Sequence, residues 1–269
     1  MSRMLLALAC GVAVLGAAPA RAKTISITIA QKTELRGTTL ASTVTIGNTG
    51  DEAAKSVAPT LRFADKQARG KMRPELQPNT TFDEELTLEA GQLGEGRWPF
   101  QVSVDYADAN QYPFQALLVT TLVQGNPPPA KVSVPEIASS GIAESGTLKI
   151  RFKNLSATER DSSYRIAVPE GLEASQPTGT VHLAAWAEAT ESVSVVNRTA
   201  LAGSRYPVFV SIEYDDGGVH QGVVAQGIVD IVAPSDFWQR NQMTLFIGAG
   251  ILVVLWLGLV VRRATSRAT

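Results

Sequence analysis

Few residues in the sequence have side chains suited to catalysis. His182 and His220 are the only histidines. A Ser-His-Asp hydrolase would also need a nucleophile on a sharp strand-to-helix turn, and no G-x-S-x-G pattern supplies one. Cys10 is the only cysteine and falls in a segment that we expect to be removed, so we expect no disulfide, thiol catalysis or cysteine metal site. We therefore predict a protein that is not an enzyme and that holds no cofactor.

Acidic residues near the end of residues 23–235, called the body below, could bind a metal ion. Asp215 and Asp216, with Glu213, have the hard oxygen ligands that Ca²⁺ prefers. The same run continues as Asp-Asp-Gly-Gly between two strand-like segments, which is also what a tight hairpin needs. The spacing matches no calcium loop, so the prediction is a hairpin and no metal site, with calcium as the alternative. His220 aligns with Tyr112 across this hairpin and is expected at an ordinary strand position.

Two features are candidates for binding. Trp186 has no counterpart in the internal repeat described below, so it is the best single candidate for a partner contact, and an exposed aromatic ring would also suit a sugar. The run KQARGKMR at 66–73 is either a solvated loop or a patch for an acidic partner. Its bases are Lys66, Arg69, Lys71 and Arg73.

An internal repeat organises the body. Residues 97–108 read RWPFQVSVDYAD and residues 205–216 read RYPVFVSIEYDD, at an offset of 108. Residues 44–48 match 150–154 at an offset of 106, and 86–88 correspond to 193–195. Three matches in the same order predict a duplicated unit of about a hundred residues, which is enough to bury its own core.

The repeated segments alternate apolar and polar residues, which is typical of half-buried strands. The predicted fold class is all-β, with two tandem immunoglobulin-like β-sandwich domains and one C-terminal transmembrane α-helix. The domains are predicted at 23–125 and 131–233, joined by a proline-rich linker at 126–130 that is stiff enough to hold them as a rod. Residues 181–191 form either a short helix or an edge strand.

Both ends of the chain are predicted to serve targeting and anchoring. Residues 1–22 have the pattern of a signal peptide: an early base, an apolar stretch and a small-x-small cleavage site. After a juxtamembrane segment (234–242), residues 243–261 are uncharged and long enough to cross a bilayer. The interface anchors are predicted to be Phe237, Trp238, Arg262 and Arg263, and the basic tail 262–269 places the C-terminus in the cytoplasm. The expected location is the bacterial cytoplasmic (inner) membrane, with the body in the periplasm.

The charge of the body argues against nucleic acid. Five of the 24 Lys and Arg residues lie outside 23–242, which leaves 19 bases against 25 acids inside that span. Nucleic-acid binding depends on neutralising phosphates with Lys and Arg, so a mildly acidic body is unsuited to it.

Each unit resembles the extracytoplasmic sandwich modules of the NEW3/CARDB kind, including S-layer-related tandem repeats. The resemblance is carried by Asn48-Thr-Gly50 and Asn154-Leu-Ser156, and by the late strands at 98–108 and 206–216. It implies spacer or interaction domains and brings no catalytic residues. We predict a protein partner in or near the cytoplasmic membrane, with this chain as its scaffold or accessory subunit. The alternative is a carbohydrate-binding or adhesion module. N-x-S/T sequons occur at Asn79, Asn154 and Asn197.

Overall fold

The structure is a computed structural model that describes residues 24–234 together with 243, 244, 246, 247 and 251. The predicted signal peptide, the four interface anchors Phe237, Trp238, Arg262 and Arg263, and most of 243–261 lie outside the described residues. Within the described part, no helix has the length and apolar character needed to span a bilayer. Every element of residues 24–232 is a strand, which confirms the all-β prediction.

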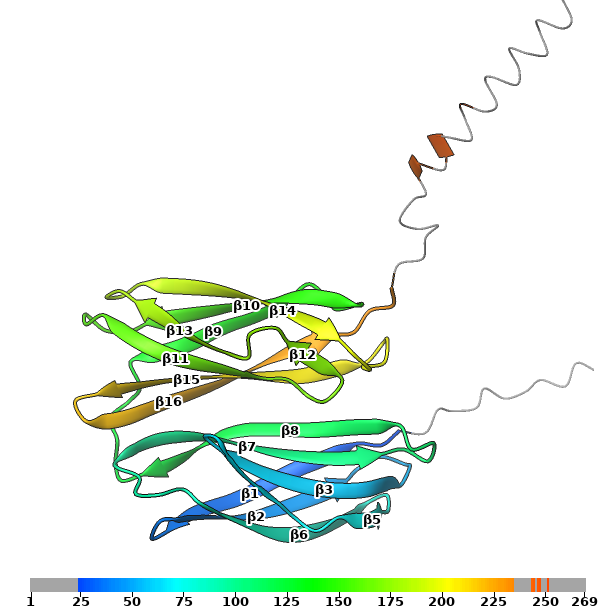
Figure 1. Ribbon diagram of the computed structural model, residues 1–269, viewed down its shortest axis with the longest axis horizontal. Helices are drawn as coiled ribbons and strands as arrows, with labels where there is room; N and C mark the ends of the chain where they lie inside the picture. The colour runs from blue at the N-terminus through cyan, green and yellow to red at the C-terminus, as the bar shows by residue number, and fades with distance from the viewer. Residues whose placement is uncertain (1–23, 235–242, 245, 248–250, 252–269) are drawn as a thin grey trace, which may run out of the picture.

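Residues 24–124, called the first half below, form two facing layers of strands (Figure 1). One layer is an antiparallel sheet in the order β1-β2-β6, and in the other β7 pairs with β3 and β8 while β3 also pairs with β4 and β5. The strands are β1 (Ile27–Arg36), β2 (Thr39–Asn48), β3 (Ala54–Phe63), β4 (Lys66–Arg69), β5 (Arg73–Leu76), β6 (Thr80–Glu89), β7 (Gly96–Ala107) and β8 (Pro113–Gln124).

Residues 132–232, the second half, repeat this plan. One sheet has the order β12-β14-β10-β9. The strands β13-β11-β15-β16 face it and belong to a nine-stranded sheet that continues into the first half, where β16 pairs in parallel with β7 at His220 and Gly96. The strands are β9 (Val132–Ser139), β10 (Ser145–Asn154), β11 (Arg160–Ala167), β12 (Leu172–Ala174), β13 (Thr178–Leu183), β14 (Glu188–Asn197), β15 (Arg205–Asp216) and β16 (Val219–Asp230). Residues 181–191, expected as a short helix or an edge strand, contribute to β13 at the edge and to β14.

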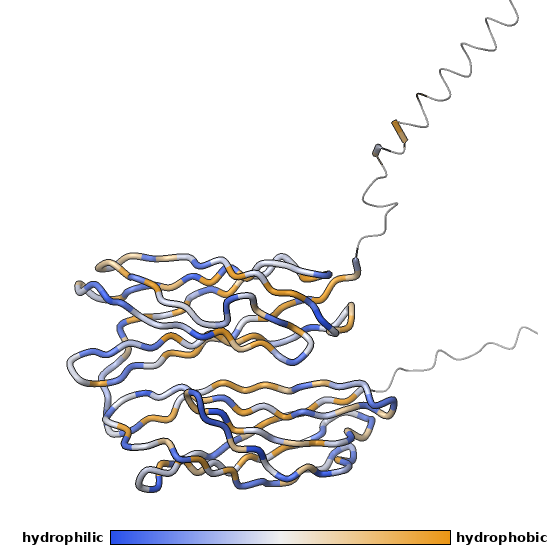
Figure 2. Tube along the Cα trace, in the orientation of Figure 1, coloured by the Kyte–Doolittle hydropathy of each residue, from blue (hydrophilic) through white to orange (hydrophobic). Residues whose placement is uncertain are grey.

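Apolar and polar residues alternate along the strands, and the apolar side chains face inward to form the cores (Figure 2). Val102 and Val104 of β7 are fully buried in one cluster, and the matching Val210 and Ile212 of β15 are fully buried in another. The two clusters share no residue. Each half is therefore sandwich-like, with its own apolar interior between two layers.

A buried asparagine ends the same strand in both halves. Asn48 closes β2, and its side-chain amide donates to the carbonyls of Glu52 (2.7 Å) and Leu76 (3.2 Å). Asn154 closes β10 and donates to Thr158 (2.8 Å) and Leu183 (3.2 Å) in the same way. The Oδ1 atom of each accepts a backbone N–H two residues on, at 3.0 Å. The Asn-containing turns in the sequence are thus structural corners, in which a buried side chain holds the loop that follows it.

The last hairpin of each half has the predicted strands. β15 and β16 are joined by Gly217 and Gly218, whose φ angles of 62° and 84° are those that a two-residue turn requires. The prediction of a hairpin at Asp-Asp-Gly-Gly is confirmed. The loop that joins β7 and β8 is longer. In the second half His220 pairs with Asp215, and at the corresponding place in the first half Pro113 pairs with Ala107. The expected alignment of His220 with Tyr112 is therefore wrong by one residue.

The two halves lie side by side, not end to end as the expected rod would require (Figure 1). Arg97 of β7 explains the difference, because its guanidinium donates to the carbonyls of Pro128 (2.5 Å) and Pro127 (3.2 Å) and to Gln221 Oε1 of β16 (2.9 Å). Gln221, which is buried, also donates to Pro128 at 3.2 Å. The linker is thus hydrogen-bonded to both halves and turns the chain back on itself.

Candidate functional site

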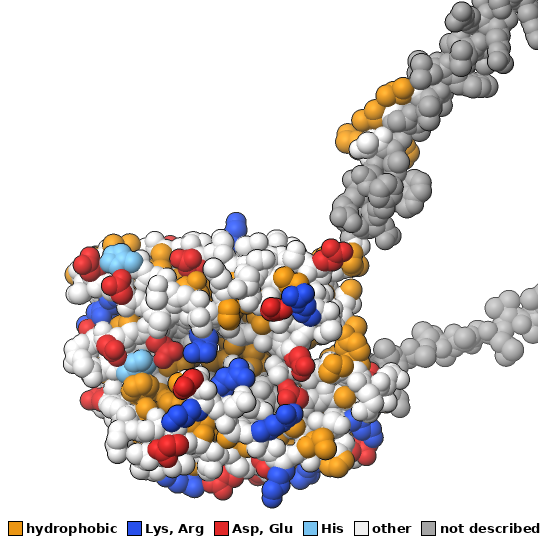
Figure 3. Space-filling view, in the orientation of Figure 1, with side chains coloured by type: hydrophobic (Ala, Val, Ile, Leu, Met, Phe, Trp, Pro, Cys, Tyr) orange, Lys and Arg blue, Asp and Glu red, His pale blue; other side chains and the backbone are white. Residues whose placement is uncertain are grey.

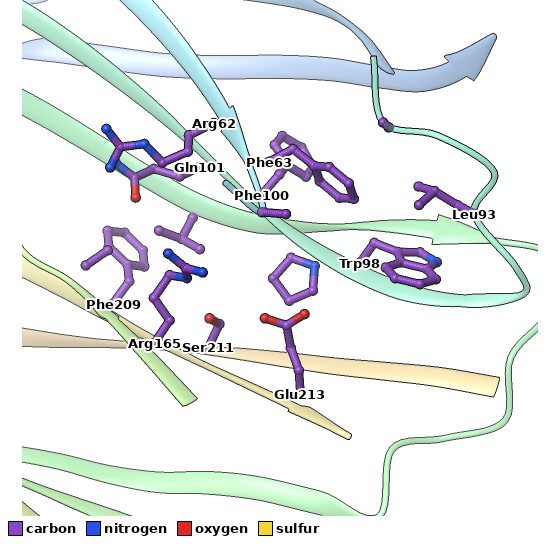
Figure 4. A pocket seen from close by; sticks show the side chains of 15 residues that line it. Arg62, Phe63, Leu93, Trp98, Phe100, Gln101, Arg165, Phe209, Ser211 and Glu213 are labelled. Carbon is purple, nitrogen blue, oxygen red and sulfur yellow. The ribbon is translucent and has the colours of Figure 1, made fainter. Parts of the chain in front are cut away.

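A cleft lies between the two halves. Its volume is about 290 Å³, and its walls come from β3, β7 and β8 of the first half and from β11 and β15 of the second. Its lining is mainly apolar (Figure 4): Phe63, Leu93, Trp98, Phe100 and Phe209. A mostly apolar cavity with a few polar groups between two packed units is the usual form of a small-ligand site.

Two arginines, one from each half, line the cleft. Arg62 is next to Gln101 in the pairing of β3 with β7, and Arg165 is next to Ser211 in the pairing of β11 with β15. Arg62 donates to Gln67 Oε1 at 3.2 Å. Among the residues that the structure describes, neither guanidinium forms an ion pair with a carboxylate. Figure 3 shows basic and acidic side chains around exposed hydrophobic atoms where the halves meet.

A histidine cluster lies beside this cleft. The ring of His220 stacks on Trp98 of the first half, with centroids 3.9 Å apart and an angle of 13° between the planes. Its Nε2 is 3.1 Å from Glu213 Oε2, and its Nδ1 is 3.0 Å from Asp215 Oδ1. Burial opposes the charged form, but the two carboxylates outweigh it and raise the pKa of His220. This cluster ties the halves together and offers no nucleophile.

Close backbone contact fixes the distance between the halves at the same place. Gly222 of β16 lies so near β7 that an added Cβ would be 2.5 Å from Pro99 Cγ and 2.7 Å from the carbonyl oxygen of Arg97. At the other end of the interface, the hydroxyl of Tyr112 donates to the carbonyl of Thr199. The cleft is therefore held between two units that are tied at both ends.

Trp186 projects from the turn between β13 and β14. Its side chain is 64 % exposed, and its φ angle is 59°, in the left-handed region that bulky residues rarely adopt. Its backbone N–H donates to the carbonyl of Ser156 at 3.0 Å. Trp186 lies just before β14, the strand that pairs with β10. Asn79, with a φ angle of 57°, lies just before β6, the strand that pairs with β2 in the first half. The expectation that Trp186 has no counterpart is wrong: an asparagine, which tolerates this conformation, occupies the equivalent position.

The basic run 66–73 is not a loop. Its ends belong to β4 and β5, short strands that both pair with β3. Three of its bases have partners: the Lys66 ammonium donates to the carbonyl of Glu89 (2.8 Å), Arg69 is 3.5 Å from Asp105, and Arg73 lies over the Phe82 ring. Lys71 is exposed. The partner contact predicted for these four bases stays a prediction.

The carboxylates considered for calcium are engaged with cations. Asp216 lies 2.9 Å from the Lys131 ammonium and 3.2 Å from the guanidinium of Arg160, which is itself buried. The hydrogen bond from Lys131, followed by that from Arg160, lowers the pKa of Asp216. Asp215 contacts His220. In the described residues, no three or more carboxylate, histidine or cysteine side chains gather as a metal site would require.

Sequence reasoning missed the cleft because its residues come from strands far apart in the chain. One signal was available. Alternation assigns Val208 and Val210 to the core of the second half, which leaves Phe209 between them on the outer face. Phe209 is nevertheless 5 % exposed, because the first half covers it. A large aromatic residue at an outward position of a core strand therefore indicated a second packing surface.

Comparisons with known proteins add no family. No family model matches the chain, and no curated protein matches it. Among solved structures, a transglutaminase from red sea bream is similar over 80 % of this chain and 31 % of its own, with 14 % identity and a TM-score of 0.27. Salmonella and Escherichia coli alpha-2-macroglobulins are similar over 78 % of this chain and 16 % and 18 % of theirs, with 12 % and 11 % identity and TM-scores of 0.33. The chain spans less than a third of each structure, and at these scores neither name transfers to it.

Proposed function

We propose that the chain is a non-enzymatic, membrane-anchored envelope protein that holds or positions a protein partner. Its two halves would be tandem immunoglobulin-like domains, exported by the signal peptide at 1–22 and anchored by the helix at 243–261. The body would lie in the periplasm, with Arg262 and Arg263 on the cytoplasmic side.

The observation that carries this proposal is the conformation of Trp186. A bulky residue in the left-handed region costs roughly 1–2 kcal/mol relative to a residue that tolerates it. Packing of the ring contributes little against this cost, because Trp186 is 64 % exposed. Strain kept at an exposed aromatic side chain supports a binding role, since tryptophan is the residue most enriched at the centres of protein interfaces.

The position of Trp186 suits a partner away from the membrane. Trp186 lies beside Ser156, just past the end of β10, whereas Val232 donates to Ile142, just before β10 begins. The ten residues of β10 therefore separate Trp186 from the point where the chain leaves the body, a span of about 30 Å. With the helix at 243–261 in the bilayer, Trp186 would point into the periplasm.

Replacing Trp186 with asparagine, the residue at the equivalent position of the first half, tests the proposal. The Trp186→Asn variant is expected to have a free energy of unfolding about 1 kcal/mol higher, because the strain is relieved, and to lose the partner that co-purifies with the wild type in mild detergent. Leu201→Ala is the matched control, since Leu201 is also exposed (45 %) but lies near the chain exit. Retention of the same stoichiometric partner by Trp186→Asn would overturn the proposal.

A carbohydrate-binding or adhesion module is the second candidate, favoured by the same exposed ring, because an unburied aromatic face can stack on a sugar. A glycan array separates the two candidates. Binding to a defined glycan that Trp186→Ala abolishes would replace the protein partner with a sugar.

A further inference from the structure

We propose that the cleft between the halves binds a small apolar carboxylate, of the medium-chain fatty acid class. This site is separate from Trp186, so the two proposals succeed or fail independently.

The walls of the cleft fit an apolar chain. Phe63 and Phe100 come from the core side of the first half and Phe209 from the outer face of the second, so both halves contribute aromatic rings to the lining. Leu93 and Trp98 continue this apolar wall, and the Trp98 ring is held in place by its stack on His220. An apolar chain that displaces water from this apolar part of the lining gains free energy.

The charge of the cleft selects an anion. Arg62 and Arg165 line it from opposite halves, and the only acid in its lining is Glu213, whose carboxylate is occupied by His220 Nε2 at 3.1 Å. Gln101 and Ser211, the strand neighbours of the two arginines, add neutral hydrogen-bonding groups. A guanidinium binds a carboxylate through two parallel hydrogen bonds, which makes a carboxylate at this place the natural counterpart of the two arginines.

The size of the cleft limits the ligand. A volume of about 290 Å³ is at the small end of ligand sites, which range over roughly 300–1,000 Å³. One acyl chain with its own carboxylate fits this limit better than a diacyl phospholipid with a headgroup. The contact of Gly222 with Pro99 and the bonds of Arg97 to the linker keep the halves from opening further.

Binding of radiolabelled octanoate to the full chain in nanodiscs tests this site by equilibrium dialysis. Comparison of variants in identical nanodiscs cancels the octanoate that partitions into lipid. The double variant Arg62→Gln/Arg165→Gln is expected to bind octanoate roughly tenfold more weakly, because charged hydrogen bonds are lost. Octan-1-ol, which has the same chain length and no charge, is expected to bind both proteins equally.

Two further variants separate the cleft from the rest of the surface. Ala167→Leu adds bulk to the lining of the cavity and is expected to abolish binding of both octanoate and octan-1-ol. Arg198→Gln removes an exposed arginine that pairs with Glu173 outside the cleft, and binding should not change. Octanoate binding that is equal in the wild type and in the double arginine variant would overturn the proposal, whatever the stability of Ala167→Leu.

Discussion

The buried asparagine that ends β10 should be among the most sensitive positions of the second half. Asn154 is fully buried, and its amide donates to the carbonyls of Thr158 (2.8 Å), Ala184 (3.0 Å) and Leu183 (3.2 Å). Asn154→Ala leaves these carbonyls without their side-chain donor, and the carbonyl of Leu183 is in a buried place. The two amide hydrogens satisfy these acceptors, and each acceptor left unsatisfied in a buried place costs about 1–3 kcal/mol. The expected loss of unfolding free energy is therefore about 3 kcal/mol.

Hydrogen exchange with mass spectrometry locates this loss. In Asn154→Ala, exchange should rise in β10, β13 and β14, while the first half keeps its protection. Asn48→Ala should do the reverse, raising exchange in β2 and β6. Asn110→Ala, in an exposed loop, is the control. A loss of stability below about 0.5 kcal/mol, which is typical of surface substitutions, would refute the reasoning, as would an equal rise of exchange in both halves.

Three other changes test how the halves are held. Gly222→Val should push β16 from β7 at a cost of about 1–3 kcal/mol, seen as a longer distance between spin labels on the two halves; an unchanged distance would count against the packing. The raised pKa of His220 means that its stabilising contribution is complete below the ordinary histidine pKa and is lost as the pH rises through the raised value. Unfolding measured between about pH 6 and pH 8 should therefore show a decline in the wild type that His220→Gln lacks. Asp216→Ala leaves the buried Arg160 guanidinium without its carboxylate, and urea titration should show a loss of about 3 kcal/mol; a loss near zero would mean that Arg160 is well solvated.

Local patterns were sufficient to predict much of the fold. The alternation at 97–108 and 205–216 predicts strands whose buried and exposed faces are those observed, and Asp-Asp-Gly-Gly predicts the hairpin because only glycine adopts both positive φ angles easily. Residues 181–191 left both a short helix and an edge strand possible, because the segment contains the end of β13, a turn and the start of β14 and so has no single period.

Features that depend on packing between the halves were not predictable in the same way. The linker was expected to be stiff and extended, and the contacts of Arg97 and Gln221 that turn it back come from residues 124 positions apart. The run at 66–73 was expected to be either a solvated loop or a patch for an acidic partner, and its charges gave no sign that its ends would pair with β3. The left-handed conformation of Trp186 has no sequence signal, since tryptophan is among the residues least expected there.

Site-specific photo-crosslinking in native membranes tests the central claim most directly. A photoreactive amino acid replaces Trp186 in one sample and Leu201 in another, and mass spectrometry identifies the adducts. A partner bound at the end remote from the chain exit predicts one abundant protein adduct at position 186 and none at position 201. No protein adduct at position 186, or the same adducts at both positions, would contradict the claim.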